Sequence, residues 1–333
     1  MTGLSPSMRL ARLLDGFLTT QLIYIAARLR LDEVLAGGPQ TGAAVAAAVG
    51  ADPDRLGQVL RGLVSVEVLD EDDQGRFRLT PVGVALAPMR SAALIRGDLY
   101  YEAAAALPDS LIDGGVAFRR AYGTDFFDHL GAHSDVAATF QRAMGERSEG
   151  EVREVLAAYD FGELRTVVDV GGGQGTLLAA ILQQVPELTG ILVDRDVAVQ
   201  SAVRTFAAAG LSDRTQCVVG DFFDRLPAGH DGYLLSRVLH DWSDDDARQI
   251  LRCCRRAVSA DGRLIVVDAL LPARVADGRD AIRMDLHMMV LFGSRERTEE
   301  ELAALLADAG FALRSVSLTS SPTRLAVLEA TPT

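Results

Sequence analysis

Three aspartates lie at the ends of three successive apolar segments in the second half of the chain. Asp169 lies directly before a glycine-rich turn, and Asp194 and Asp221 end the next two segments. If these segments are parallel strands, their carboxyl ends meet at the sheet edge where doubly wound proteins bind ligands. There, Asp194 can accept hydrogen bonds from both hydroxyls of a ribose. Asp221 can accept one from an adenine amino group while Phe222 covers the ring, so the pattern predicts a nucleoside site.

The glycine-rich turn favours a cationic nucleoside over a dinucleotide. Gly171, Gly173 and Gly175 have the spacing GxGxG, and glycine lets the backbone approach a ligand closely. A nicotinamide dehydrogenase has the spacing GxGxxG, which places a pyrophosphate at the amino end of a helix. The carboxylate of Asp169 suits a positive charge better than a diphosphate, so the sequence disfavours a dehydrogenase.

A histidine follows the fourth apolar segment at the same predicted edge. His240 comes after residues 232–235. A single histidine is more often structural than catalytic, but this one shares an edge with the nucleoside site. An imidazole with a pKa of about 6.5 can share or take the proton of a phenol, whose pKa is about 10 as in tyrosine. His240 is therefore a candidate general base.

Four acidic residues follow His240, namely Asp241, Asp244, Asp245 and Asp246. They resemble a metal-binding cluster, but acidic residues are also favourable at the amino end of a helix. The sequence has no histidine and cysteine cluster beside them. A histidine base needs no metal, so we predict a site without one.

The elements that carry these residues alternate between strands and helices. The expected strands are 166–170, 190–194, 216–219, 232–235 and 263–268, and the expected helices are 177–184, 197–209 and 244–258. A helix over 299–309 and two late strands, 313–318 and 326–328, complete the pattern. This alternation predicts an α/β fold with a Rossmann-like doubly wound sheet.

The amino-terminal part is mostly helical. A helix over 41–49, a second one beginning at Asp52 and Pro53, and a hairpin around the acidic turn 71–75 outline a winged helix. Residues 1–90 hold nine arginines against ten acidic residues. This balance and the acidic hairpin tip disfavour DNA binding, so a dimerisation role is expected.

Length and composition limit the other classes of function. A chain of 333 residues is comfortable for more than one domain, and we divide it into a winged-helix part (1–95), a helical connector and substrate lid (96–160) and a catalytic part (161–333). The net charge of −13 argues against a nucleic-acid partner. No segment resembles a membrane span or a signal peptide. Three cysteines give no disulfide framework, and a cytoplasmic enzyme is expected.

The chain resembles the class I small-molecule O-methyltransferases, which include plant phenylpropanoid and bacterial aromatic-polyketide enzymes. The resemblance covers nearly the whole chain and is carried by residues 168–175, 220–223, 239–242 and 295–298. It implies S-adenosylmethionine as methyl donor, S-adenosylhomocysteine as product, and a small aromatic hydroxyl compound as substrate. It also implies a homodimer formed through a winged-helix dimerisation domain.

The resemblance assigns further cofactor contacts. Gly171, Asp194, Asp221, Phe222 and Ser148 stand where the family contacts the cofactor. Serine stands at a position that is often lysine in relatives, and we expect the neighbouring arginine to compensate. With the aspartate and glycine of the turn, the predicted cofactor-binding residues are Ser148, Asp169, Gly171, Gly173, Asp194, Asp221, Phe222, Ser236 and Arg237.

In this resemblance His240 is the general base. Methyl transfer from a sulfonium is an in-line displacement, so the enzyme must align the hydroxyl oxygen and remove its proton. The family places acidic residues beside the histidine, which correspond here to Asp268 and Glu296. One of them is aspartate where plant relatives have glutamate. A carboxylate of this kind orients the imidazole.

The resemblance also indicates an aromatic pocket. Phe140, Met144 and Met288 are expected to line it. Asp285 and His287 are close to Met288 in the sequence and could form a hydrogen bond with a polar substituent of the substrate. Methionine adapts well to flat rings. All the basic residues are arginine, a bias associated with bacterial sources that decorate polyketide-type natural products.

Two alternatives to phenol methylation stay open at this point. One is a family member that has diverged to N- or C-methylation or to cofactor-assisted hydroxylation. The other, which the acidic hairpin disfavours, is a ligand-sensing regulator that binds DNA.

Overall fold

The computed structural model describes residues 5–333, except for the side chains of 147–149. The contacts between residues group the described chain into two compact units. One comprises the chain up to Ala105 together with Phe127–Glu146, and the other comprises Ala106–Phe126 and Arg147–Thr333. The division into parts 1–95, 96–160 and 161–333 stays a prediction.

The first unit contains the predicted helix, helix and hairpin. Thr41 and Asp52 cap the two predicted helices, which begin at Gly42 and Pro53. The Thr41 side chain accepts a hydrogen bond from Ala44 N, and the Asp52 side chain accepts one from Arg55 N. A two-residue strand also pairs with the hairpin and was not predicted. The elements are α1 (Pro6–Leu14), α2 (Gly16–Arg28), α3 (Leu31–Val34), β1 (Gln40–Thr41), α4 (Gly42–Val49), α5 (Pro53–Ser65), β2 (Leu69–Glu71), β3 (Arg76–Leu79) and α6 (Pro81–Val84).

The segment that follows is mostly helical, as predicted. Its elements are η1 (Ala87–Met89), α7 (Arg90–Gly97), α8 (Leu99–Ala105), α9 (Leu107–Asp113), α10 (Ala117–Tyr122), α11 (Phe126–Ala132) and α12 (Ser134–Ala158). In the described part of the chain, no single helix is long and apolar enough to cross a membrane. The pair α1 and α2 passes that test only together, with a bend of 43° between them.

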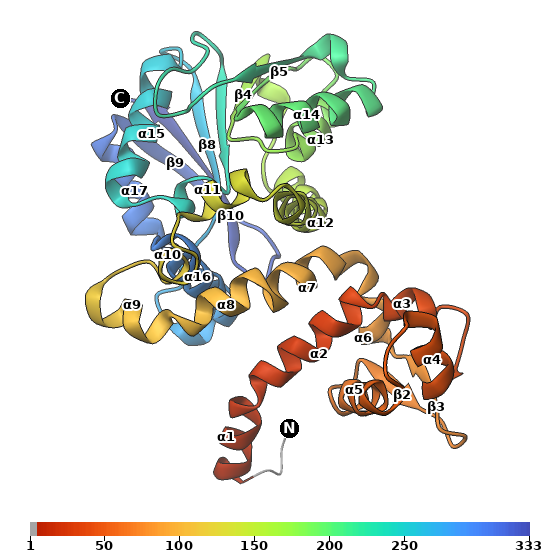
Figure 1. The fold of residues 1–333 in the computed structure, drawn as a ribbon. Helices are drawn as coiled ribbons and strands as arrows, with labels where there is room; N and C mark the ends of the chain where they lie inside the picture. The colour runs from red at the N-terminus through yellow and green to blue at the C-terminus, as the bar shows by residue number, and fades with distance from the viewer. Residues whose placement is uncertain (1–4) are drawn as a thin grey trace. The chain divides into compact units, whose positions relative to one another are not determined.

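The second unit is built on a mixed sheet of seven strands (Figure 1). The first five strands in spatial order are parallel. The sixth pairs antiparallel with the fifth, and the seventh pairs antiparallel with the sixth and so runs in the same direction as the first five. The short segment 319–324 joins β9 to β10, and so short a connection permits only an antiparallel pair. In spatial order the strands are β6 (Thr215–Val219), β5 (Thr189–Asp194), β4 (Thr166–Val170), β7 (Gly232–Ser236), β8 (Arg263–Ala269), β10 (Leu325–Pro332) and β9 (Phe311–Leu318).

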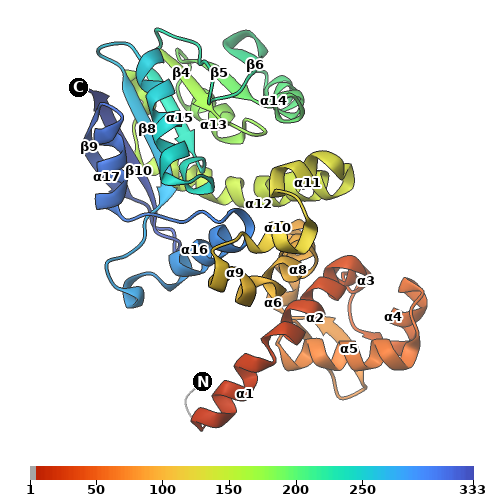
Figure 2. The same ribbon diagram turned by 60° about the vertical axis from the view of Figure 1, so that its left-hand side comes forward.

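Helices cover both faces of this sheet (Figures 1 and 2). Alternate residues of β8 show the two layers, because Ile265 packs into one core and Leu264 into the other. The first core includes α13 (Thr176–Gln184) and α14 (Asp196–Ala208), and the second includes α15 (Asp244–Ala257) and α17 (Glu299–Asp308). The predicted doubly wound fold is confirmed. An additional helix, α16 (Arg279–Phe292), was not predicted.

The order of the sheet determines where a ligand site can form. The chain winds outward through β4, β5 and β6 and then returns to place β7 on the other side of β4. Open α/β sheets bind ligands at the carboxyl ends of the strands beside such a reversal. The glycine turn follows β4 and His240 follows β7, the two strands that border it. Asp169 lies near the end of β4, and Asp194 is the last residue of β5.

Candidate active site

The end of β4 contains a buried carboxylate. Asp169 is only 1% exposed, and its Oδ1 atom has no hydrogen-bond partner among the described residues. Burial, together with the charge of Asp194, raises the pKa of Asp169 to about 7. A Cβ atom on Gly172 would lie 2.4 Å from Asp169 Oδ2, so glycine is required there. A buried acid with an unsatisfied oxygen fits a cationic ligand group.

The turn after Asp169 presents bare backbone. Gly171 has a φ of 74°, and a Cβ atom on it would lie 2.9 Å from Val238 Cγ2 and 3.5 Å from the Phe222 ring. Its N–H donates to Val193 O at 2.8 Å. The absence of a side chain therefore lets the turn lie close to Val238 and to the Phe222 ring.

The next two predicted acids lie at the same edge. Asp194 Oδ2 accepts a hydrogen bond from Gly173 N at 2.8 Å, and its Oδ1 accepts one from Arg195 N at 2.6 Å. Burial raises the pKa of Asp194, and these two N–H groups partly oppose the rise. Each carboxylate oxygen still has a lone pair for a ligand hydroxyl. Asp221 is exposed, and its Oδ1 accepts from the backbone N–H of the second residue after it at 2.9 Å.

Two further predicted cofactor contacts, Ser236 and Arg237, lie at the end of β7. Ser236 ends β7 and is half-buried. Arg237 has a φ of 56°, a left-handed conformation that is uncommon for residues other than glycine. Its guanidinium donates to Glu151 Oε1 of α12 at 2.7 Å and lies 3.8 Å from Glu296 Oε1. Its contact with the cofactor stays a prediction. Ser148 lies among the residues whose side chains are outside the description.

Three residues far apart in the sequence meet around the candidate base. His240 lies in the 3₁₀ turn η4 (Leu239–Asp241) and is buried. Its Nδ1 atom is 2.9 Å from Glu296 Oε1 and 3.8 Å from Asp268 Oδ1. A carboxylate can only accept, so Nδ1 carries the proton and Nε2 is the basic nitrogen of the neutral ring. Nε2 lies 3.4 Å from Asp241 Oδ1.

The charges around His240 make it a stronger base. Burial alone would lower its pKa, but the charges of Glu296, Asp241 and Asp268 outweigh burial and raise it to about 9. Burial also raises the pKa of Asp268, despite the opposing charge of the imidazole. The neutral form of His240 therefore becomes more populated as the pH rises toward 9.

By distance alone, this cluster could also hold a metal ion. Ligand atoms of His240, Asp268 and Glu296 all lie within 4.8 Å of one another. However, Glu296 already accepts from His240 and faces the Arg237 cation at 3.8 Å. A metal would have to compete with both, so we interpret the cluster as an oriented base.

The predicted substrate residues fall in both units. Asp285 Oδ1 accepts a hydrogen bond from Glu296 N at 2.9 Å, so this carboxylate holds the segment that carries Glu296. On the same helix, His287 is half-buried and Met288 is buried. In the first unit, Phe140 and Met144 lie four residues apart on α12 and so share a face. The pocket that these residues would form together stays a prediction.

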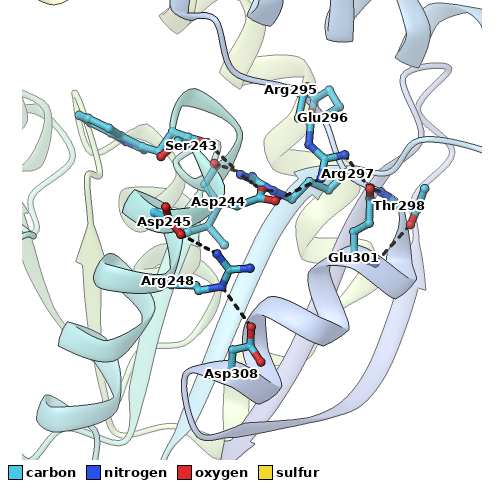
Figure 3. A network of polar contacts seen from close by, with 12 residues as sticks. Ser243, Asp244, Asp245, Arg248, Arg295, Glu296, Arg297, Thr298, Glu301 and Asp308 are labelled. Atoms are coloured by element: carbon cyan, nitrogen blue, oxygen red, sulfur yellow. Dashed lines mark hydrogen bonds and ion pairs between the residues drawn. The ribbon is translucent and has the colours of Figure 1, made fainter.

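Two further residues that contact the site were missed in the sequence. Glu151 binds Arg237, and no local pattern around it indicates that role. Arg297 is buried beside Glu296 and bonds the turn that carries His240. It stands in the motif 295–298, so its position next to a predicted acid was the available signal. Figure 3 shows it within a polar network that links the start of α15 to the segment before α17.

Comparison with known proteins identifies the family of the chain. The profile of the O-methyltransferase domain matches residues 100–312, and that of the O-methyltransferase dimerisation domain matches residues 11–88. The chain belongs to the O-methyltransferase family. The predicted enzyme class, an S-adenosylmethionine-dependent O-methyltransferase, is thereby confirmed. The dimerisation profile supports the predicted homodimer.

Individual relatives match over nearly their whole lengths. The chain is 38% identical over 331 residues to a phenazine O-methyltransferase of Lysobacter antibioticus, covering 97% of this chain and 95% of the relative. It is similar to the crystal structure of an O-methyltransferase from neocarzinostatin biosynthesis, solved with S-adenosylmethionine and 2-hydroxy-5-methyl naphthoic acid. That likeness has a TM-score of 0.83 at 38% identity and covers 95% of this chain and 96% of the other. An aclacinomycin 10-hydroxylase of Streptomyces purpurascens is 37% identical over 93% of this chain and 86% of its own length.

Proposed function

We propose that this O-methyltransferase methylates a phenolic hydroxyl of a small aromatic natural product, with His240 as the general base. The observation that carries the proposal is the buried pair in which Glu296 Oε1 lies 2.9 Å from His240 Nδ1. This pair fixes the proton on Nδ1 and leaves Nε2 to act on a substrate. The three free cysteines, Cys217, Cys253 and Cys254, suit the reducing cytoplasm.

The energetics of proton removal fit a phenol. The pKa of His240 is about 9, close to that of a phenol at about 10. Such a match allows Nε2 to take the proton as the oxygen becomes nucleophilic. Glu296 stabilises the resulting imidazolium, as the carboxylate of a catalytic triad does. S-adenosylmethionine, when bound, supplies the methyl group.

The residues at the edge of the sheet fit this cofactor. Asp169 would hold a positive group, because its buried Oδ1 lacks a partner among the described residues. The lone pairs of Asp194 would accept the ribose hydroxyls. Asp221 would accept a hydrogen bond from the adenine amino group, and Phe222, whose ring lies beside Gly171, would cover the adenine ring.

The chemistry of the relatives supports an aromatic acceptor. Matching proteins include O-methyltransferases named for phenazine, 2,7-dihydroxy-5-methyl-1-naphthoate and 3-amino-4-hydroxybenzoate. The buried Met288 and the half-buried Phe140 and Met144 are apolar groups of the kind that contact flat rings.

N-methylation and hydroxylation are the competing activities within the family. Relatives include an N,N-dimethyltransferase and the hydroxylase. The oriented His240 favours O-methylation, because a phenol needs a base to become a strong nucleophile, whereas an amine attacks through its own lone pair. Hydroxylation forms no methylated product.

A product screen tests the proposal. The enzyme is incubated with radiolabelled S-adenosylmethionine and panels of phenols, anilines and quinone-type polyketides, and the products are separated by mass. We expect label on phenol oxygen, in products 14 mass units heavier than the acceptor, as one methyl replaces one hydrogen. Label only on nitrogen, or a hydroxylated product without label, would replace this proposal with one of the two alternatives.

Replacing Asp169 with asparagine should weaken cofactor binding. Loss of a charge-assisted contact of about 1.5–3 kcal/mol corresponds to a dissociation constant for S-adenosylhomocysteine that is about 10–100-fold higher. In the wild type, affinity should also fall as the pH drops below about 7, because the proton then bound to Asp169 cancels its charge. The asparagine variant should lack this pH dependence.

Titration calorimetry at two pH values measures both effects. The exposed Asp213 in η3 (Ser212–Arg214) lies at the amino end of β6, away from the carboxyl ends of the strands, and provides the matched control Asp213→Asn. Equal affinities in wild type and Asp169→Asn would remove Asp169 from the cofactor site.

A further inference from the structure

Arg297 is buried against the turn that carries His240. Its side chain is 2% exposed, which is rare for an arginine. Nη1 donates to Leu239 O at 2.7 Å, Nη2 donates to Trp242 O at 2.8 Å, and Nε donates to Asp244 Oδ1 at 2.9 Å. Each nitrogen of the guanidinium thus has an acceptor, and one of the three is a charged partner.

The two carbonyls that Arg297 binds bracket the base. Leu239 directly precedes His240, and Trp242 follows it by two residues. The guanidinium is planar and holds its donors in a fixed fork. By binding both carbonyls, it fixes the main chain of the turn from which the imidazole projects.

The segment behind Arg297 is itself fixed. Leu271 N donates to Arg297 O at 2.9 Å, next to the end of β8 that carries Asp268. Thr298 and Glu301 form a capping box at the start of α17. Figure 3 shows this box beside Arg297, together with Asp244, the first residue of α15. The guanidinium of Arg297, which we call the clamp, therefore projects from a segment that hydrogen bonds hold in place on both sides.

Adjacent residues consequently hold the base in two ways. Glu296 binds the ring at Nδ1, and Arg297 binds the main chain on both sides of it. We propose that Arg297 is a positioning residue, which keeps the turn of His240 where the imidazole meets Glu296. This inference extends the proposed role of His240 and rests on it for its effect on catalysis.

Arg295 provides a matched control in the same segment. It also binds Asp244, at 3.3 Å, and it pairs with Glu301 at 2.6 Å. It is 45% exposed, and none of its hydrogen bonds described here reaches the turn of His240. Arg295→Lys therefore changes a neighbouring arginine on the same acid without loosening the clamp.

The test compares Arg297→Lys with Arg295→Lys by NMR titration of the His240 ring. The chain has five histidines, and His240→Gln assigns the signal. The charged groups that face this ring are Glu296, Asp241 and Asp268, and Arg237 lies 3.8 Å from Glu296. A lysine reaches fewer acceptors, so the ring should move away from Glu296 and its pKa should fall from the wild-type value toward 6.5.

The kinetic readout should move with the titration. In Arg297→Lys we expect kcat to fall roughly 10²-fold, as a displacement near 1 Å can cause, with an unchanged dissociation constant for S-adenosylhomocysteine. Arg295→Lys should match the wild type in all three measurements. A general loss of folded protein would lower the active fraction but would leave the titration of the folded molecules unchanged.

A folded Arg297→Lys with wild-type His240 titration and wild-type kcat would overturn the proposal. If that variant does not fold, Asp244→Asn loosens the guanidinium through its charged partner. It should shift the titration in the same direction by a smaller amount, and no shift would overturn the proposal. A shifted titration with unchanged kcat would support Arg297 as the clamp and count instead against His240 as the base.

Discussion

Replacing His240 with glutamine should lower kcat for methyl transfer by about 10²–10⁴-fold, the usual contribution of a general base. Glutamine can still donate an N–H to Glu296 Oε1, which now accepts from Nδ1 at 2.9 Å. It has no group that can take a proton near neutral pH. The phenol then reaches the transition state still protonated, and steady-state kinetics with a phenolic acceptor measure the loss.

Binding and folding should be spared in this variant. We expect the dissociation constant for S-adenosylhomocysteine to stay at the wild-type value, because the cofactor acids lie on β4 and β5. The control is His230→Gln, in which the same change is made at the amino end of β7, whereas His240 follows its carboxyl end. If His240→Gln retained wild-type kcat, His240 would have no role in proton removal.

Replacing Glu296 with glutamine should cause a loss of similar size, about 10²–10⁴-fold in kcat. The glutamine amide can donate to Nδ1, which places the ring proton on Nε2, the nitrogen that must accept. The largest of the three charges that raise the pKa of His240 to about 9 is also lost. The rise of activity with pH should therefore move to lower pH, toward 6.5.

The pH profile separates this role from a general defect. A folding defect lowers kcat at every pH, whereas loss of the Glu296 charge also shifts the titration. The exposed Glu299, three residues further along, provides the control Glu299→Gln with the same change of charge. A Glu296→Gln profile that coincides with the wild type in height and position would contradict the proposed pair.

The parallel part of the sheet could be predicted from the sequence with bounds close to those observed. β4 has the predicted range, because a buried apolar strand ends at a turn where Gly171 and Gly173 adopt positive φ. Such strands give strong local signals. β1 is only two residues long and α16 mixes polar with apolar residues, so neither gave a clear signal.

The site shows the same division. The positions of Asp169 and Asp194 at the ends of predicted strands were enough to place both at the carboxyl ends of the sheet. The contact of His240 with Glu296 joins residues 56 apart, and only the family resemblance indicated it. The clamp by Arg297 depends on burial of a charged side chain, which no local pattern of residues predicts.

The most direct test of His240 as the base compares two acceptors of the same skeleton. One is the ordinary phenol, and the other carries a substituent that ionises it at the assay pH. Single-turnover rates are measured for wild type and His240→Gln with both. The proposed mechanism predicts a loss of about 10²–10⁴-fold for the ordinary phenol, and a much smaller loss for the ionised one, which has no proton to remove. An equal loss with both acceptors would show that His240 does not act by removing the phenol proton.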